Sequence, residues 1–379
     1  MSFYKKYILP QLFKKDPEDA HDRVSWLLKE FGGIPLVSEM LQSYFTVRNP
    51  RLKQELWGLT FENPIGLAAG FDKTGESLPG WQDIGFGFLC GGGVTPLPQT
   101  GNQKPRVFRL VKDRAIINRM GLNGPGAEAV AEILRAVRSR IKVPLFINIG
   151  KGKDTPLENA PDDYAFVMGR LYPYGDAFVA NVSSPNTKDL RMLQGKNYLD
   201  AIILEMQKKR ERLMRNGGKQ PWKPILVKIA HDLSPKETNE ILEVCVERNV
   251  DGIIATNTTI SREGVSDDLL AEEAGGLSGP PLFPKALEMV RYIHKKLPQF
   301  PIVGVGGISS ANDAFKMFEA GARLLQVGTG LVYEGPGLPR DINRGLVKMF
   351  ENRLIDMWSF VPEPACMGVP KSPAGWSED

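Results

Sequence analysis

Residues 300–330 read FPIVGVGGISSANDAFKMFEAGARLLQVGTG and contain the structural unit that decides the fold. A short apolar run at 302–305 ends in glycines, a helical stretch follows, and a second apolar run at 324–327 ends in Gly-Thr. Nearly continuous apolar runs of this length are typical of strands buried on both faces, as in a parallel sheet covered by helices. The stretch therefore predicts a β/α repeat with polar and glycine residues just after each strand.

The same unit recurs from residue 60 onward. Eight apolar runs fit it, at 64–69, 86–91, 145–149, 177–182, 225–229, 252–255, 302–305 and 324–327. Eight β/α units are typical of an α/β protein of the (β/α)8 TIM-barrel class. A doubly wound sheet is the alternative, but it needs fewer strands and usually a phosphate loop after the first. Segments 106–110 and 115–119 flank a turn and predict a β-hairpin inserted after the second strand.

The first 45 residues form a small helical domain in this interpretation. Apolar residues recur at helical spacing between lysines, and Gly32-Gly33 ends the longest run. Two interpretations remain open: a helical cap packed on the barrel, or a basic, aromatic hairpin lying on an anionic membrane surface. The expected organisation is a helical domain at 1–45, the barrel at 46–359 and a loosely ordered, Pro-rich tail at 360–379.

Composition excludes several classes of protein. Of the 379 residues, 42% are hydrophobic and 24% charged, so the chain is neither disordered nor collagen-like. The net charge of 48 − 44 = +4 is too small to indicate nucleic-acid binding. Three cysteines without a C-x-x-C motif and three scattered histidines argue against disulfides and a metal site, and no apolar run is long enough to span a membrane.

The strand ends carry the chemistry that a barrel enzyme would use. Active sites of this fold lie at the carboxyl ends of the strands, and here those ends hold mostly amides, hydroxyls, glycines and lysines. Asp72 is the only acid among them, whereas a glycosidase needs two facing carboxylates. The predicted site is therefore suited to hydrogen-bonding a flat, polar, anionic ligand.

Glycines after the last two strands indicate where a phosphate would bind. Gly304, Gly306 and Gly307 would let backbone N–H groups approach an anion, and Gly328-Thr329 follows one strand later. Gly279 could add another N–H group. Taken alone, the Gly304 motif could also be a tight turn. Together with Gly328-Thr329 after the next strand, it favours a phosphate site.

Two lysines and a serine loop need separate interpretations. Lys228 lies inside an apolar strand, where an unpaired charge is costly, so a ligand with delocalised negative charge or a barrel acid must partner it. Lys73 is either a ligand-binding or a loop lysine. The Ser-Ser-Pro-Asn stretch at 183–186 is typical of a turn, and no histidine is placed to activate either serine, which argues against a hydrolytic triad.

Seven motifs in order resemble the dihydroorotate dehydrogenase family. They are AGFDK at 69–73, GVTP at 93–96, INRMG at 117–121, NVSSPNT at 181–187, TNTT at 256–259, GLSG at 276–279 and GVGG at 304–307. The match runs from about residue 3 to residue 350. Ser184 and the N-terminal helices resemble the membrane-associated, quinone-dependent class 2, because the soluble class 1 enzymes carry Cys at that position.

The resemblance implies an FMN-dependent oxidoreductase that oxidises (S)-dihydroorotate to orotate in pyrimidine biosynthesis, with a ubiquinone-type quinone as final acceptor. Ser184 would take the C5 proton, Lys73 would hold the substrate carboxylate, and Lys228 would stabilise the reduced ring. The expected substrate-binding residues are Lys73, Asn118, Arg119, Met120, Gly121, Leu122, Asn181, Asn186, Asn257 and Thr258. The expected FMN-binding residues are Ala69, Gly70, Lys73, Gly93, Asn148, Asn181, Lys228, Thr256, Ser278, Gly279, Gly306, Gly307, Gly328 and Thr329.

The resemblance also implies a quinone tunnel through the N-terminal helices, with His21 and Arg109 on its wall. The chain is then a peripheral membrane protein, at a bacterial cytoplasmic membrane or, in a eukaryote, the mitochondrial inner membrane; the apparent lack of a transit peptide favours the bacterial case. Four positions depart from the common family pattern: Phe13, Gly93, Leu122 and Gly328. Two rival interpretations are an NAD- or fumarate-linked enzyme of the same chemistry and a non-catalytic flavin- or phosphate-binding membrane adaptor.

Overall fold

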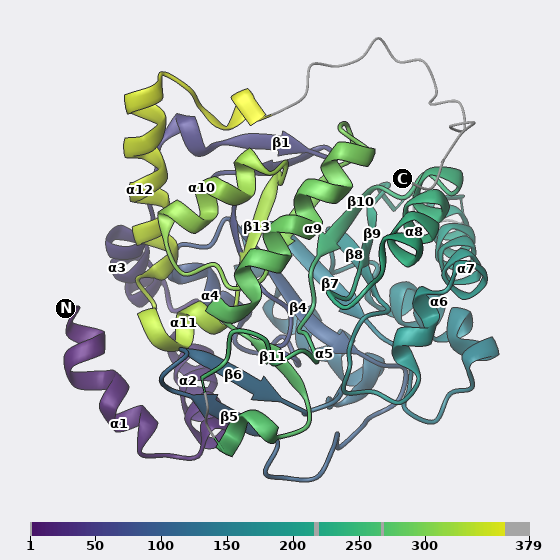
Figure 1. Ribbon diagram of the computed structural model, residues 1–379, viewed down its shortest axis with the longest axis horizontal. Helices are drawn as coiled ribbons and strands as arrows, with labels where there is room; N and C mark the ends of the chain where they lie inside the picture. Colours follow the sequence, from purple (N-terminus) through teal and green to yellow (C-terminus); the bar gives the residue numbers. More distant parts are fainter. Residues whose placement is uncertain (1, 216–219, 267–268, 361–379) are drawn as a thin grey trace.

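The computed structural model describes residues 2–215, 220–266 and 269–360. A closed barrel of parallel strands forms its centre, which confirms the TIM-barrel prediction (Figure 1). Around the barrel the strands are β3 (Ile65–Leu67), β4 (Phe88–Val94), β7 (Leu145–Ile149), β8 (Ala177–Asn181), β9 (Ile225–Lys228), β10 (Gly252–Ala255), β12 (Ile302–Val305) and β13 (Leu324–Val327). All of their residues are buried. The loosely ordered tail predicted at 360–379 lies, after residue 360, outside the described residues.

Helices cover the outside of the barrel because each carries an apolar stripe toward the strands. They are α4 (Leu78–Asp83), α5 (Gly126–Val137), α6 (Ala160–Leu171), α7 (Lys196–Arg215), α8 (Pro235–Glu247), α9 (Phe283–Lys296), α10 (Ala311–Glu319), α11 (Thr329–Glu334) and α12 (Leu338–Arg353). In α8, Ser234 and Glu237 form a capping box that fixes where the helix begins. In α10, Ser310 accepts a hydrogen bond from the Asp313 amide. Local sequence thus fixes the helix starts that follow the strands.

The amino end of the barrel is closed by a hairpin that the sequence pattern did not reveal. Strands β1 (Gln54–Leu56) and β2 (Leu59–Phe61) pair antiparallel. Phe61 packs against Phe88 and Phe146, with ring centroids 5.6 and 6.3 Å away, and these two rings lie 4.9 Å apart. All three side chains are fully buried. The barrel therefore opens only toward the carboxyl ends of its strands.

The predicted hairpin is present and belongs to a larger sheet. Strands β5 (Val107–Leu110) and β6 (Ala115–Asn118) pair antiparallel, and β11 (Gly276–Ser278) adds a third strand beside β6. Figure 1 shows this small sheet below the barrel, next to α2. The third strand was not predicted because three residues are too few to establish an alternating pattern.

The N-terminal segment is helical, as predicted. A short π-helical turn (Tyr4–Ile8) leads into α1 (Leu9–Phe13), α2 (Pro17–Phe31) and α3 (Pro35–Phe45). Asp16 precedes α2 and caps it, because its side chain accepts hydrogen bonds from the backbone amides of Glu18 and Asp19. Glu18 then forms a buried ion pair with Arg106, 2.7 Å between Oε1 and Nη2, beside the β5–β6 sheet. The helices are thus attached to the part of the barrel that carries the small sheet.

Candidate active site

One cavity of about 730 Å³ collects nearly all of the predicted site residues. It lies at the carboxyl ends of the barrel strands and extends between α2, α3 and the β5–β6 sheet. Its lining includes Ala69, Gly70, Lys73, Gly93, Asn118, Met120, Gly121, Leu122, Asn148, Asn181, Ser184, Asn186, Lys228, Thr256, Asn257, Thr258, Ser278, Gly279, Gly306, Gly307, Gly328, Thr329, His21 and Arg109. Residues spread over three hundred positions of sequence therefore face one space.

Arg119 is the one predicted site residue that is not in this lining. Its guanidinium forms an ion pair with Glu273, 2.5 Å between Nη1 and Oε2, and lies 4.6 Å over the Phe108 ring. It also donates hydrogen bonds to the Pro105 and Ala274 carbonyls. Arg119 thus joins the small sheet to the loop before β11 and supports the site from outside.

The loop after β8 presents Ser184 to the cavity. Ser184 is 8% exposed, and its Oγ accepts a hydrogen bond from the Asn186 amide at 3.3 Å. The Asn186 side chain donates to Asn118 Oδ1 at 3.2 Å, which connects this loop to the β5–β6 sheet. No side-chain base is hydrogen-bonded to Ser184 among the described residues, so the arrangement is not a hydrolytic triad.

Side-chain amides beside this loop are held in a fixed orientation. Ser183 Oγ donates to Asn181 Oδ1 at 3.0 Å and accepts from Asn257 Nδ2 at 3.0 Å. Asn257 Oδ1 accepts from the Thr258 amide at 2.8 Å. Such mutual hydrogen bonds preset the donors and acceptors that a planar polar ligand would meet, and they discriminate against analogues that lack its polar edge.

Lys228 stands at the inner end of the cavity without a partner. It is 6% exposed, and it forms no hydrogen bond or ion pair with any described residue. Burial lowers the pKa of its ammonium group, against a small opposing effect of the Cys90 thiol. A buried cation without a counter-charge is costly, so this position is built for a ligand that carries negative charge.

Lys73 is a second buried lysine in the same cavity. Its pKa is lowered to about 8, chiefly by burial and in addition by the charge of Arg106, while Glu18 and Asp22 act in the opposite direction. Its ammonium donates to Asn123 Oδ1. An anion bound at Lys73 would restore the full charge of this group because opposite charge favours the protonated form.

Backbone at the ends of β11, β12 and β13 forms a concave, glycine-lined surface. Gly279 has φ 114°, Gly306 φ 135° and Gly307 φ 70°. A Cβ at Gly307 would lie 2.6 Å from Phe283 Cβ and 2.8 Å from the Gly279 carbonyl oxygen, so only glycine is accommodated. Main-chain N–H groups can therefore approach a phosphate closely here.

Two orphaned polar atoms indicate that a polar ligand binds at this place. Within the described residues, Asn148 Oδ1 and Thr256 Oγ1 are buried and have no hydrogen-bond partner. Both residues line the cavity, as does the glycine surface. Buried polar atoms in native proteins are normally paired, so a polar ligand is the expected partner. The glycine-lined backbone, these polar atoms and the buried Lys228 together suit a planar polar ligand with an anionic end.

Gln326 is a cavity residue that sequence reasoning missed. It is fully buried on β13 and lines the cavity, and a hydrogen-bonding contact with its amide lowers the pKa of the Cys90 thiol against the larger, raising effect of burial. The available signal was a glutamine inside the otherwise apolar run LLQV at 324–327. Its amide adds a further polar group to the cavity lining.

The part of the cavity next to the N-terminal helices is different in character. Apolar side chains dominate there: Ile8, Leu12, Phe13, Val24, Leu27, Leu28, Leu41, Phe45 and Leu331. The His21 ring packs edge-on to Phe71 at 6.1 Å, and burial lowers its pKa. Arg109 donates to the Leu12 carbonyl at 3.1 Å and lies 4.6 Å over the Phe13 ring. An apolar passage with two polar groups thus leads to the polar end.

Two features are absent from the part of the chain that the structure describes. Among residues 2–215, 220–266 and 269–360, no cluster of His, Cys, Asp and Glu could hold a metal ion. Within the same described part of the chain, no helix combines the length and the apolar character that crossing a bilayer requires.

A closed (β/α)8 barrel with a polar, glycine-lined cavity at the carboxyl ends of its strands defines an enzyme of the TIM-barrel class. The family model described as dihydroorotate dehydrogenase matches residues 51–350. This match covers most of the sequence, and the chain belongs to the dihydroorotate dehydrogenase family.

Individual relatives agree with this assignment. "Dihydroorotate dehydrogenase (quinone)" of Christiangramia forsetii is 47% identical over 346 residues, which cover 91% of this chain and 99% of the relative. The protein of the same name from Thermus thermophilus is 44% identical over 341 residues, covering 90% and 95%. The crystal structure of ligand-free type DHODH from Eimeria tenella superposes with a TM-score of 0.83 at 37% identity, covering 91% of this chain and 98% of that one.

Proposed function

We propose that this chain is a quinone-dependent dihydroorotate dehydrogenase that binds FMN at the mouth of its barrel. Membership of the family makes it an oxidoreductase that oxidises dihydroorotate in pyrimidine biosynthesis. The observation that carries the proposal is one shared cavity, in which the buried Lys228 and a glycine-lined backbone adjoin an amide-rich part and an apolar passage. Each part suits one of three ligands: FMN, dihydroorotate and a quinone.

FMN would be held from both ends. The backbone at Gly279, Gly307 and Gly328 would bind its phosphate, and Asn148 and Thr256 would gain the partners that they lack within the chain. Lys228 would lie against the edge of the ring where negative charge collects. When bound, FMN supplies the acceptor for the hydride of dihydroorotate. The remaining FMN positions are those expected from the family: Ala69, Gly70, Lys73, Gly93, Asn181, Ser278, Gly306 and Thr329.

Dihydroorotate would occupy the amide-rich part. Asn118, Asn181, Asn186 and Asn257 would hydrogen-bond the ring, and Lys73 would meet its carboxylate. Met120, Gly121, Leu122 and Thr258 would complete the pocket, while Arg119 would act by supporting it. The hydrogen bonds among these side chains orient them before the substrate binds, so binding costs little side-chain conformational entropy.

Ser184 would accept the proton from C5 at its Oγ. A neutral hydroxyl takes up a proton only as it gives up its own, so a relay must continue from Oγ. Its low exposure keeps bulk water from competing for this proton. No described histidine or carboxylate touches Ser184, so the position of Oγ against the substrate matters more than its basicity.

Residues 1–45 would form the quinone domain and associate with the membrane surface. The passage lined by His21 and Arg109 runs between α1, α2 and the barrel. Large apolar side chains on these helices are exposed: Phe3, Trp26, Phe31, Leu36, Met40 and Tyr44. Lysines near the start of the chain would attract anionic lipids. Peripheral attachment to a bacterial cytoplasmic membrane is consistent with the bacterial relatives.

A visible spectrum followed by anaerobic addition of dihydroorotate tests the proposed function. The purified chain is expected to show flavin absorption that bleaches with dihydroorotate and returns with a ubiquinone analogue. A colourless protein that does not take up FMN in a titration would overturn it. Bleaching that is reversed by NAD⁺ or fumarate, but not by quinone, would instead favour the rival class.

Sedimentation with anionic vesicles tests the membrane surface. The variants Leu36→Glu and Met40→Glu should lower the bound fraction because each places a charge on the apolar face of α3. Leu354→Glu is the matched control, since Leu354 is 86% exposed but lies outside the N-terminal helices. Equal binding of all three variants to the vesicles would refute the proposal that the N-terminal helices form the membrane-binding surface.

A further inference from the structure

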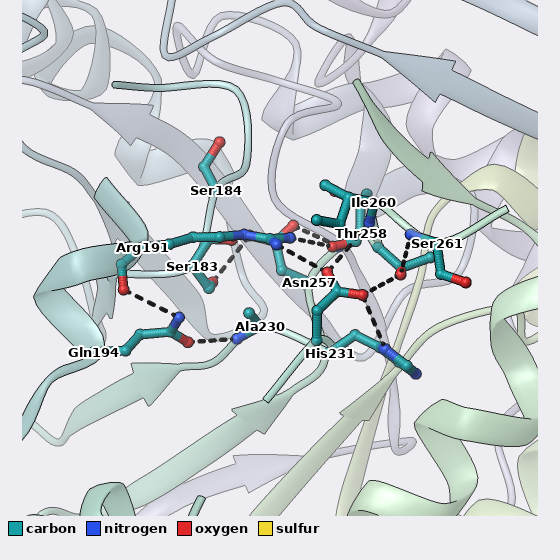
Figure 2. Close-up of polar contacts among 12 residues, drawn as sticks. Ser183, Ser184, Arg191, Gln194, Ala230, His231, Asn257, Thr258, Ile260 and Ser261 are labelled. Carbon is teal, nitrogen blue, oxygen red and sulfur yellow. Dashed lines mark hydrogen bonds and ion pairs between the residues drawn. The ribbon is translucent and has the colours of Figure 1, made fainter. Parts of the chain in front are cut away.

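A polar cluster outside the cavity lies behind the serine loop (Figure 2). Arg191, on the 3-10 helix Leu190–Gln194, pairs with Asp232 just after β9, with 2.8 Å between Nη1 and Oδ2. Neither residue lines the cavity. Their side chains are 23% and 18% exposed, so solvent screens this pair only in part. We call this pair the Arg191–Asp232 clamp.

The guanidinium of the clamp also binds two loops that face the cavity. Arg191 Nε donates to the Ser183 carbonyl at 3.4 Å, and Nη2 donates to the Thr258 carbonyl at 3.0 Å. The first carbonyl belongs to the peptide unit that leads into Ser184. The second belongs to the peptide unit that leaves Thr258. One planar group therefore joins the backbone of both loops.

Asp232 holds the guanidinium and the second loop at once. Its carboxylate accepts hydrogen bonds from Thr259 Oγ1 and from the Ile260 amide, the latter at 3.2 Å. Burial opposes its ionisation, but these donors, the His231 ring and the charge of Arg191 prevail and hold the pKa of Asp232 well below its usual range. The carboxylate therefore stays ionised and keeps the guanidinium in place near neutral pH.

The base of the clamp is fixed to the barrel itself. Gln194 Oε1 accepts from the Ala230 amide at 2.7 Å, and its Nε2 donates to the Arg191 carbonyl at 3.3 Å. Ala230 follows the strand that ends in Lys228. In Figure 2 the Ser184 side chain points away from the guanidinium, so the clamp acts on backbone and not on the hydroxyl.

We infer that Arg191 is a positioning residue for proton removal: it holds the loop of Ser184 in register with the loop of Asn257 and Thr258. This inference rests on the proposed function. Displacement of a reacting group by about 1 Å can slow a reaction about 100-fold, so a clamp of this kind has a measurable effect although it touches no ligand. The clamp contributes no residue to the apolar passage, so quinone reduction should not depend on it.

Two variants of the full-length, FMN-loaded chain test the clamp. Arg191→Gln and Arg191→Lys each lose the planar fork that reaches three acceptors. We expect anaerobic flavin reduction by dihydroorotate to slow by about 10- to 100-fold. Reoxidation of the reduced protein by a ubiquinone analogue should keep its rate. Asp232→Asn should give a smaller loss in the same half-reaction.

The chain offers a matched control in Arg138→Gln. Arg138 donates to the carbonyls of Tyr174 and Ile141 and pairs with Asp176 at 2.8 Å, with side chains 28% and 23% exposed. This pair lies at the amino end of β8, whereas the serine loop follows the carboxyl end of that strand, and neither Arg138 nor Asp176 lines the cavity. The variant should lower the Tm by an amount similar to Arg191→Gln while both half-reactions keep their rates.

The outcomes separate the two proposals. Normal flavin reduction in both Arg191 variants would overturn the clamp, and so would equal losses in both half-reactions. If Arg191→Gln fails to fold, the Arg191→Lys rates decide between these results. Failure of the unmodified chain to be reduced by dihydroorotate would refute the proposed function, and the clamp would fall with it.

Discussion

In the proposed reaction, the hydroxyl of Ser184 is the group that accepts the proton from the substrate. Ser184→Ala should slow flavin reduction by dihydroorotate by about 10²- to 10⁴-fold, because the group that accepts the C5 proton is lost. Binding of FMN and orotate should persist, since Ser184 is small and, within the described part of the chain, its side chain only accepts a hydrogen bond from the Asn186 amide. Anaerobic stopped-flow absorption measures the rate. Ser139→Ala, at an exposed site, is the control, and equal rates for both variants would refute the role.

Lys228 gives a second prediction at the same scale. Lys228→Met should lower the reduction potential of the bound flavin by tens of millivolts, because a buried cation stabilises added negative charge and about 30 mV corresponds to about 1.4 kcal/mol for two electrons. Spectroscopic titration against a reference dye measures this shift.

A second buried lysine provides the control for this titration. Lys223 donates to the carbonyls of Tyr172 and Gly175 and does not line the cavity. Lys223→Met should destabilise the fold and leave the potential unchanged. A potential that is equal in both variants and the unmodified chain would place Lys228 away from the ring.

Single residues also show where sequence reasoning succeeds. Strand ends and family motifs predicted Ser184, Lys73 and Lys228 as site residues, and all three line one cavity. They could not show that Arg119 is engaged by Glu273, because the two are 154 positions apart and only tertiary packing joins them. Gln326 was missed because it occupies an apolar strand.

The contact between α2 and the small sheet depends on one buried ion pair. Glu18 and Arg106 side chains are 9% and 7% exposed. Arg106→Gln should weaken this contact by about 3 kcal/mol, because it leaves a buried carboxylate with only the more exposed Lys104 near it. Hydrogen–deuterium exchange should rise in residues 17–31. Lys53→Gln, in an exposed pair with Glu62, should change nothing.

The same pair predicts a dependence on pH. The hydrogen bond from Arg106 lowers the pKa of Glu18, burial partly opposes this, and the charges of Arg106 and Lys104 add to the lowering. The stabilisation is therefore complete above the unfolded glutamate pKa of about 4.3 and is lost as the pH falls through the lower folded value. Exchange in α2 should increase under acid conditions, and Glu18→Gln should abolish this increase. An unchanged acid response in Glu18→Gln would contradict the assignment.

At the level of elements, length decided what could be predicted. Each of the eight barrel strands was predicted from an apolar run of at least four residues that recurs in a β/α rhythm, and the structure confirms all eight, although β3 itself keeps only three residues. Strands β1, β2 and β11 have three residues each, and their pairing depends on partners that the local sequence does not specify. The hairpin of β5 and β6 was predictable because its partners adjoin in sequence.

For the whole molecule, the reactions at the two ends of the cavity, flavin reduction by dihydroorotate and quinone reduction, should be separable by mutation. Deletion of residues 1–45 should leave flavin reduction by dihydroorotate near its normal rate, because the amide-rich end is built from the barrel. Turnover with a quinone should fall by about tenfold or more, since the apolar wall that positions this substrate is removed. Steady-state assays with each acceptor measure the split. Full quinone turnover in the truncated chain would refute the passage.

The hairpin of β1 and β2, which closes the amino end of the barrel, determines from which end ligands can reach the cavity. Because the rings of Phe61, Phe88 and Phe146 pack against one another across the amino end of the barrel, no ligand can pass through the barrel from end to end. Every reactant must therefore enter and leave the cavity at the carboxyl ends of the strands. The amide-rich part and the apolar passage must both open at this one end of the barrel, each beside its own set of lining residues.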